Sequence, residues 1–395
     1  MKRCMSLIFL ILCTKGISQE IEFTKKLPFP DNPVSSELSL SYMSDAPNQL
    51  RAAVLAVKPV ADKPDYYTIV MTSEDGGLNW KLKEEPLTNE AADPWILGMN
   101  QNQFVLSDIS EGSKFHLKTF LNNGKEWAAP VSHGLGHDHA TILKDSDNYY
   151  LFSTQKTSDN MLLYFYRGGK GIPVIQAYEL FNGADFSVKK PVILESQIAI
   201  PVVLRGDWNG ESSNRLEQMT SWLVFLDKSS LKLTTPQLMT MRSGAKHHVL
   251  VKGNEGTLFY FYTDVERKRL EVIKSNGSDQ GWSELTLIAE SENLINLDAA
   301  SWHKDQAVIV FTKEEEKGIF QKYLCNVSAG LSISNTLKLG QQSKPDQRNG
   351  WAGRAWPQGG DYCGLISLNE DILYVMWSSA PDGIFKPYFS KINTK

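Results

Sequence analysis

The sequence predicts an all-β protein folded as one β-propeller of six or seven blades. Two observations carry this prediction. From residue 19 onward, short apolar and aromatic runs follow one another, separated by Gly, Asn, Asp and Ser, with almost no helical periodicity. These runs also recur in similar units at intervals of some tens of residues, and a repeat of this length is typical of propellers.

Each repeated unit begins with an acidic residue or a histidine just before a β-type run. The spacings between these starts are 45, 109, 51 and 63 residues, and the long gap holds one more unit, around Ile198–Val203 and Trp222–Leu226. A first unit spanning Leu38–Trp80 brings the total to six or seven. Within the fourth unit, residues 183–190 and 209–218 are expected to be loops or an insertion. The unit starts are Asp93, Asp138, His247, Asp298 and Asp361.

The two ends of the chain are expected to complete one blade together. The last unit contains only three strand-like runs and ends near Tyr388–Ile392, whereas Glu20–Leu27 alternates like a strand. Pairing the N-terminal strand with the last unit would close the ring and remove an exposed sheet edge. We therefore expect residues 19–395 to form a single propeller domain.

Residues 1–18 have the features of an export signal. A basic start precedes the apolar run Met5–Leu12, which is too short to span a bilayer, and small residues follow at Gly16 and Ser18. We expect a secreted protein, or a periplasmic or cell-surface one. Lipid attachment at Cys13 is disfavoured by the bulky leucine before it.

The charge and the cysteines exclude several classes of protein. Removing residues 1–18 takes three of the 41 basic residues and none of the 45 acidic ones, which leaves a net charge of about −7. A mildly acidic chain without a basic stripe argues against nucleic acid as a partner. No other segment is long and apolar enough for a membrane helix. We also expect the protein to be a monomer. Cys325 and Cys363 remain after export, on different predicted strands, so we do not expect a disulfide.

One turn motif is specific enough to indicate a family. Residues 73–80 read Ser-Glu-Asp-Gly-Gly-Leu-Asn-Trp and fit the pattern Ser-x-Asp-x-Gly-x-x-Trp. Such a turn needs an Asp to accept backbone N–H groups, a Gly at positive φ, and an aromatic side chain that packs the turn onto the sheet. The motif closely resembles the Asp-box of sialidase-like (BNR-repeat) β-propellers. The resemblance implies a turn between the third and fourth strands of a blade, away from the active face.

The start of the last unit extends this resemblance to chemistry. Residues 360–365, Gly-Asp-Tyr-Cys-Gly-Leu, resemble the start of the final blade in secreted bacterial exo-α-sialidase-like proteins. They are also similar to the region of sialidases that holds the nucleophilic tyrosine, which implies this role for Tyr362. The Arg-Ile-Pro-like motif of the sialidase first blade is not present, and Arg51 stands in Leu-Arg-Ala-Ala instead.

Residues at the starts of the units should converge, because the inner strands of a propeller begin at one mouth of the central channel. Strand alternation predicts that only one of His247 and His248 faces the channel, and that His137 and His139 share a face. The aspartates at these starts also suit a structural role, accepting hydrogen bonds from backbone N–H groups. The candidate catalytic residues are Tyr362, Asp361, Asp93, Asp138, His139 and His247. The candidate substrate-binding residues are Trp95, His137, Lys246, Asp298, Arg354 and Trp356.

Three functions fit such a face. The first is glycoside hydrolysis of an anionic or complex glycan, with Tyr362 attacking the anomeric carbon and Asp93 or Asp138 protonating the leaving oxygen. The second is β-elimination on a uronic acid polysaccharide, with His139 or His247 as the base and Tyr362 as the acid. The third is a non-catalytic propeller that binds glycans or a protein. We expect no cofactor, although His137, His139, His247 and Asp361 are residue types that coordinate divalent ions.

Overall fold

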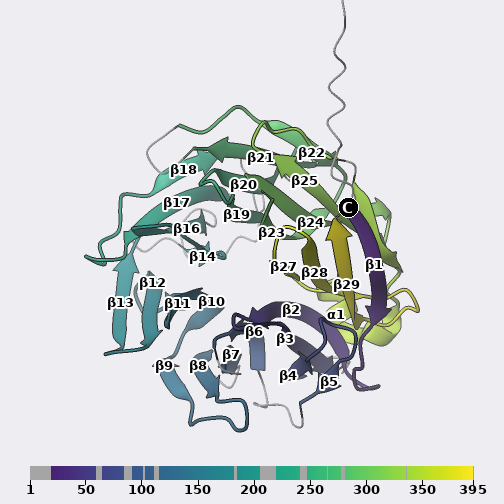
Figure 1. The fold of residues 1–395 in the computed structure, drawn as a ribbon, viewed down its shortest axis with the longest axis horizontal. Helices are drawn as coiled ribbons and strands as arrows, with labels where there is room; N and C mark the ends of the chain where they lie inside the picture. The colour runs from purple at the N-terminus through teal and green to yellow at the C-terminus, as the bar shows by residue number, and fades with distance from the viewer. Residues whose placement is uncertain are drawn as a thin grey trace, which may run out of the picture.

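The computed structural model describes residues 19–394, apart from 59–64, 84–90, 101–102, 111–114, 182–184, 205–218, 241–246, 265, 277–280, 304 and 335. The described residues form seven antiparallel sheets arranged in a ring (Figure 1). The predicted all-β propeller is thereby confirmed, with seven blades. Residues 1–18, the predicted export signal, lie outside this part of the chain. Within it, no helix is long and apolar enough to cross a membrane.

The first three blades each contain four strands in chain order, with the first strand nearest the centre of the ring (Figure 1). Blade 1 consists of β2 (Val34–Met43), β3 (Ala46–Lys58), β4 (Asp65–Ser73) and β5 (Lys81–Leu82). Blade 2 consists of β6 (Ala91–Gly98), β7 (Phe104–Ser110), β8 (His116–Asn122) and β9 (Val131–Gly134). Blade 3 consists of β10 (His137–Asp145), β11 (Asn148–Lys156), β12 (Met161–Gly169) and β13 (Val174–Glu179).

The inner strand of blade 4 is split into two pieces. The pieces β14 (Phe186–Val188) and β15 (Val192–Ile193) both pair with β16 (Gln197–Leu204), which is followed by β17 (Thr220–Asp227) and β18 (Gln237–Thr240). The expectation of a loop at 183–190 is therefore wrong for Phe186–Val188, which are buried in the sheet. The other expected loop, 209–218, lies outside the described residues.

Blades 5 and 6 return to the regular four-strand pattern. Blade 5 consists of β19 (His248–Lys252), β20 (Leu258–Asp264), β21 (Arg269–Ser275) and β22 (Thr286–Glu290). Blade 6 consists of β23 (Leu294–Trp302), β24 (Gln306–Glu316), β25 (Ile319–Ser328) and β26 (Leu337–Ser343). The connection to blade 7 contains a 3₁₀ turn (Gln347–Asn349) and the short helix α1 (Gly350–Ala355).

Blade 7 is closed by the N-terminal strand, as predicted. It consists of β27 (Gly364–Ser367), β28 (Ile372–Ser379), β29 (Lys386–Thr394) and β1 (Gln19–Lys26). Strand β1 runs antiparallel to β29, with Gln19 opposite Thr394 and Lys26 opposite Tyr388. Figure 1 shows β1 in purple beside β29 in yellow, so both ends of the described chain lie in one blade.

The hydrophobic core lies between the blades. Each of the seven contacts between neighbouring blades has its own cluster of buried apolar side chains. For example, Phe259 and Phe261 of blade 5 pack with Ile309 and Phe311 of blade 6. The apolar faces of every sheet are therefore covered by the next blade, which leaves the inner edges of the blades to carry polar chemistry. Both Cys325 and Cys363 are buried free thiols.

The turn between β4 and β5 has the bonding expected from its sequence. The Asp75 carboxylate accepts hydrogen bonds from the Asn79 backbone N–H at 2.8 Å and from the Ser73 hydroxyl at 2.9 Å. Trp80 packs edge-on against Phe389 of blade 7, with ring centroids 5.3 Å apart. The turn thus joins blade 1 to blade 7, far from the inner strands.

The glycines of this turn give a direct test of its packing. Gly77 has φ +86°, and a Cβ added there would lie 2.2 Å from the Phe389 ring. Gly256 has φ +106° and no atom within 4 Å of such a Cβ. We expect Gly77→Ala to destabilise the fold by about 3 kcal/mol, since strain and overpacking add, and Gly256→Ala by about 1 kcal/mol. Urea unfolding of both variants measures the difference, and equal losses would contradict the packing role.

Candidate active site

A cavity of about 70 Å³ lies where the inner strands of the propeller meet. Six of the seven blades contribute to its wall, including residues directly before or within the inner strands β6, β10, β14, β19, β23 and β27. Residues separated by up to 270 positions in the chain therefore face one small space. Its polar and aromatic lining residues are Asp93, Trp95, His139, Thr141, Lys189, Lys190, His247, His248, Asp298, Asp361 and Tyr362.

One side of the cavity is acidic. Glu37 of β2 is 3% exposed and hydrogen-bonds to the carboxyl group of Asp93 in β6. Burial raises the pKa of Glu37 well above its usual range, and the charges of Asp93 and Asp361 add to this rise. Burial also raises the pKa of Asp93. The two carboxyl groups therefore retain a proton at a pH where isolated carboxyl groups are ionised.

Tyr362 adjoins this carboxyl pair. Its ring packs against Trp95 with centroids 5.8 Å apart, and its hydroxyl lies 3.5 Å from the Pro94 carbonyl oxygen, a long contact. Burial raises the pKa of the phenol well above its usual range, and the nearby charges of Glu37 and Asp93 raise it further. Tyr362 is therefore a neutral phenol whose proton can leave only to a neighbouring base.

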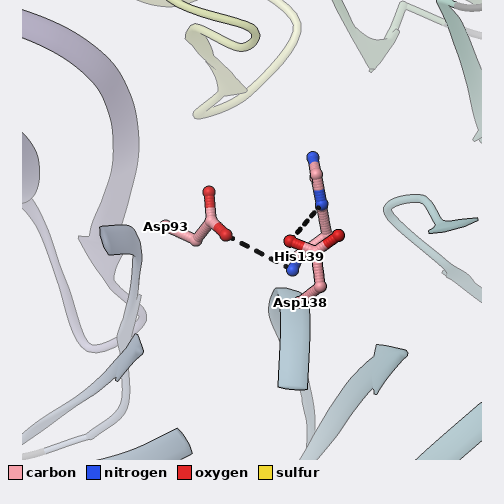
Figure 2. A group of neighbouring side chains, drawn as sticks. All are labelled: Asp93, Asp138 and His139. Carbon is pink, nitrogen blue, oxygen red and sulfur yellow. Dashed lines mark hydrogen bonds and ion pairs between the residues drawn. The ribbon is translucent and has the colours of Figure 1, made fainter. Parts of the chain in front are cut away.

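The acidic side continues to β10, where His139 lies between two carboxylates (Figure 2). Its Nδ1 lies 2.9 Å from the Asp138 carboxylate, and its backbone N–H donates to Asp93 at 3.4 Å. Burial disfavours the imidazolium, but the charges of Asp138 and Asp93 outweigh it and raise the pKa of His139. This histidine thus carries a positive charge more readily than a free one.

Lysine and histidine side chains from blades 4 and 5 also line the cavity. Lys189 and Lys190 lie between β14 and β15 of blade 4, and His247 and His248 begin blade 5. The Lys190 ammonium lies 3.0 Å from the Asp298 carboxylate, which also accepts the backbone N–H of Leu365 at 2.8 Å. The cavity therefore brings carboxyl groups together with lysine and histidine side chains.

Irregularities in the inner strands place these side chains. The pairing register shifts at Glu37 in β2, at Asp93 in β6 and at His139 in β10, and the inner strand of blade 4 breaks at Lys189 and Lys190. Asp93 and His139 also have positive φ, 49° and 52°. Because a β-bulge adds one residue and re-aims its neighbours, these irregular strands can turn a polar side chain toward the axis.

The comparisons with known proteins agree with this architecture. No protein-family model matches the sequence, and no curated protein matches it. Among solved structures, a protein of unknown function from Dyadobacter fermentans is similar over 95% of this chain and 99% of its own, with a TM-score of 0.56 at 11% identity. The phage phi92 endosialidase is similar over 94% of this chain and 69% of its own, with a TM-score of 0.52 at 13% identity. A variant of the NanB sialidase from Streptococcus pneumoniae is similar over 92% of this chain and 70% of its own, with a TM-score of 0.50 at 10% identity.

The fold is that of the sialidase-like propellers. At these identities the likeness concerns the fold alone, so the chemistry has to be argued from the side chains of this chain. Among the described residues, no arginine lines the central cavity of this propeller. Arg51 is 6% exposed, where it donates to the Leu50 carbonyl oxygen at 2.9 Å and pairs with Glu74 at 2.9 Å.

Most of the predicted site residues reach the cavity, but not all. Asp93, Trp95, His139, His247, Asp298, Asp361 and Tyr362 line it, and Asp138 adjoins it through His139. Trp356 lies beside it, in the wall of a neighbouring cavity. Arg354 is exposed on α1 and lines neither cavity. Lys246 lies outside the described residues.

Two expectations based on strand alternation are wrong. Both His247 and His248 line the cavity, because β19 begins only at His248 and His247 precedes the paired strand. His137 and His139 do not share a face, because the register of β10 shifts between Asp138 and Thr141. The His137 ring is 1% exposed and lies 2.8 Å from the Ser153 hydroxyl and 3.1 Å from the His133 carbonyl oxygen.

A metal would find three candidate ligands in this site. Asp93, Asp138 and His139 each offer one ligand atom, all within 4.8 Å of one another (Figure 2). Of the set considered from the sequence, His137 is excluded because both of its ring nitrogens have protein partners. The His139 Nδ1 already contacts Asp138. A metal bound through this nitrogen would replace the contact with Asp138.

Proposed function

We propose that the protein is a glycoside hydrolase that cleaves an anionic glycan, with Tyr362 as the nucleophile. The observation that carries the proposal is the position of Tyr362, buried beside the hydrogen-bonded carboxyl groups of Glu37 and Asp93. A buried phenol needs an adjacent base to become a nucleophile, and glycoside hydrolysis uses paired carboxyl groups. The structures of sialidases with the same fold support this assignment at the level of architecture.

In the first chemical step, the Tyr362 oxygen bonds to the anomeric carbon while the bond from that carbon to the leaving oxygen breaks. The phenolic proton passes to the ionised member of the Glu37–Asp93 pair, and Asp361, in its protonated form, gives its proton to the leaving oxygen. Asp361 is suited to this role because it lines both the central cavity and the neighbouring one. The leaving group thus departs past this carboxyl group.

In the second step, water attacks the anomeric carbon and the bond to Tyr362 breaks. Asp361, now ionised, takes a proton from the water, and the Glu37–Asp93 pair returns its proton to the phenolate. Each group ends in its starting state, as a catalyst must. Two displacements at one carbon predict retention of the anomeric configuration.

A lysine in the cavity lining supports an anionic substrate. Lys189 lines the cavity from blade 4, close enough to His139 and His248 for its charge to lower the pKa of both. A substrate carboxylate could pair with Lys189 while the anomeric carbon lies at Tyr362, because both residues line the same small cavity. We expect Lys189→Met to raise KM by about tenfold with little change in kcat, because a contact made equally in the ground and transition states affects binding alone. Steady-state kinetics check this, and an unchanged KM would remove Lys189 from the substrate site.

One observation favours a second reaction, β-elimination on a uronate glycan. His139, His247, Lys189 and Tyr362 line the same cavity, and elimination needs a base, an acid and a cation near the carboxylate. Hydrolysis remains the better fit because the nearest charged neighbours of Tyr362 are acids rather than cations. A phenol among acids resists becoming a free phenolate and needs the coupled proton transfer described above.

The products distinguish these functions. The purified protein is incubated with sialylated and uronate-containing glycans, and the fragments are weighed by mass spectrometry. Hydrolysis predicts fragments that together gain one water. Fragments with no added water would mean elimination and would overturn the proposal. Intact glycans throughout would favour a propeller that binds glycans without cleaving them.

We also propose that the protein acts outside the cytoplasm, on the basis of residues 1–18.

A further inference from the structure

The segment that carries Asp361 and Tyr362 is held from blade 6. Both residues precede β27, so they lie before the paired part of blade 7. Asn296 of β23 donates from its side-chain amide to the Gly360 carbonyl oxygen at 3.0 Å. The Cys363 thiol donates to the Asn296 carbonyl oxygen at 3.4 Å. One residue of blade 6 therefore contacts the chain on both sides of Asp361 and Tyr362.

Asn296 reaches this segment because the inner strand of blade 6 is irregular. The pairing register shifts between Ile295 and Asp298, and Asn296 has φ +57°. Asparagine adopts this left-handed backbone more readily than most residues. Asn296 is only 1% exposed, so its amide group needs partners within the protein. Both ends of the amide have one, because the NH₂ group donates to Gly360 and the oxygen accepts from a lysine.

That lysine, Lys322 of β25, sets the orientation of the amide. Its ammonium lies 2.6 Å from the Asn296 side-chain oxygen and 3.4 Å from the Asn296 carbonyl oxygen. An ammonium can only donate, so the amide oxygen faces it and the NH₂ group is left to donate to Gly360. Lys322 also hydrogen-bonds to the Cys363 thiol. It therefore acts on both contacts between blade 6 and the segment that carries Tyr362.

Stability alone does not account for a lysine at this position. Lys322 is 4% exposed, and within the described part of the chain its ammonium contacts only neutral groups of Asn296 and Cys363. Burial lowers the pKa of Lys322 accordingly. Buried charges are normally paired with an opposite charge, because removing an ion from water is costly. Holding the segment before β27 is a role that does account for it.

The same segment also packs closely against blade 1. Gly360 has φ +105°, and a Cβ added there would lie 2.8 Å from the backbone nitrogen of Glu37. The chain is thus confined by Glu37 of blade 1 and Asn296 of blade 6. A displacement away from Asn296 would move Tyr362 relative to Glu37 and to Trp95, on which its ring packs.

We propose that Lys322 is a positioning residue that, through Asn296, holds Tyr362 in place at the central cavity. Asp361, the preceding residue, is placed by the same contacts. Lys322 itself lines neither cavity, so it acts through its neighbours rather than on a substrate. The consequence for catalysis rests on the proposed function, whereas the placement of the two side chains does not.

Two variants test the placement. Lys322→Met keeps most of the side-chain volume but removes the ammonium, and Asn296→Asp keeps an acceptor for Lys322 but has no N–H to donate to Gly360. Both variants should fold, because the first removes a buried charge and the second gives that charge a partner.

The readout is the nuclear Overhauser effect between the ring protons of Tyr362 and Trp95, whose centroids lie 5.8 Å apart. It is measured in protein deuterated except for its Tyr and Trp rings. We expect this signal to be lost in both variants. Lys228→Met is the control, because it removes an ammonium 2.9 Å from the Asp145 carboxylate, away from the central cavity, and should leave the signal unchanged. An unchanged signal in folded Lys322→Met and Asn296→Asp would overturn the inference.

Kinetics separate positioning from a purely structural role. For a protein that hydrolyses glycans, both variants are expected to lower kcat by about 100-fold and to keep KM within about threefold, since displaced catalytic groups weaken transition-state stabilisation rather than binding. An unchanged kcat would overturn the role in catalysis. Loss of the Tyr362–Trp95 signal in a protein that cleaves no glycan would support the positioning by Lys322 and would count against the hydrolase alone.

Discussion

Replacing Tyr362 by Phe is expected to lower kcat for glycan hydrolysis by at least about 10³-fold, which corresponds to about 4 kcal/mol of transition-state stabilisation. The variant lacks only the oxygen that would bond to the anomeric carbon. Its fold is expected to be unaffected, because the phenol makes one long contact to the Pro94 carbonyl oxygen and the ring keeps its packing against Trp95. Glycan affinity should also stay within about threefold, since the sugar contacts are unchanged.

Single-turnover kinetics and thermal unfolding of Tyr362→Phe measure these effects together. Tyr150→Phe provides a matched control, because it removes a phenol oxygen 3.3 Å from Asp145 in blade 3, away from the central cavity. The control should retain the activity of the unmodified enzyme within about twofold. If Tyr362→Phe kept more than a tenth of the original kcat, Tyr362 would not be the nucleophile.

The second large effect concerns Glu37. We expect Glu37→Gln to lower kcat by at least about 100-fold, because one carboxyl group of the base pair is lost. The same substitution should stabilise the protein at neutral and alkaline pH. The glutamine amide can still donate a hydrogen bond to Asp93, and no second negative charge has to be buried beside it.

The sign of this effect follows from the raised pKa of Glu37. Between the unfolded and the folded pKa, the folded protein binds more protons than the unfolded chain, so stability falls as pH rises. The favourable contribution of Glu37 is complete below its unfolded pKa of about 4.3 and is lost as pH rises through the folded pKa. Glu37→Gln has no carboxyl group to ionise at this position, so the variant does not lose this stability as pH rises.

Thermal unfolding between pH 5 and pH 9 measures the difference. The Tm of Glu37→Gln should exceed that of the unmodified protein by about 3–6 °C at pH 8 and should depend less on pH. Glu126→Gln, a change at an exposed residue of blade 2, controls for the loss of a negative charge. Parallel Tm curves for Glu37→Gln and the unmodified protein would show that Glu37 is not buried as a protonated acid.

The sequence predicted the fold well because the relevant information is local and repeated. Strand alternation, turn residues and the Asp75 turn each occur within a few positions, and the repeat predicts six or seven blades. Closure by β1 could also be predicted, since the last unit lacked one strand. The convergence of Asp93, Asp361 and Tyr362 followed from the symmetry of a propeller rather than from any local motif.

The missed residues show where sequence reasoning ends. Glu37 stands one residue before the first unit considered, in a run of buried residues, and only the bulge in β2 directs it to Asp93. Lys189 does lie between two strand pieces, in the stretch 183–190 that the sequence predicts as a loop, but the split strand that brings it to the cavity could not be predicted. The prediction that His137 and His139 share a face was wrong because His139 has a left-handed backbone, which breaks the alternation of the strand. Bulges are set by contacts between strands, and a single sequence does not contain those contacts.

The measurement that tests the central claim most directly is the configuration of the first sugar released. Proton NMR follows the anomeric signals during rapid hydrolysis of a sialylated or uronate-containing glycan, before the free sugar equilibrates. A Tyr362 nucleophile requires two displacements and predicts the same configuration as in the substrate. A first product of inverted configuration would mean direct attack by water and would contradict the account.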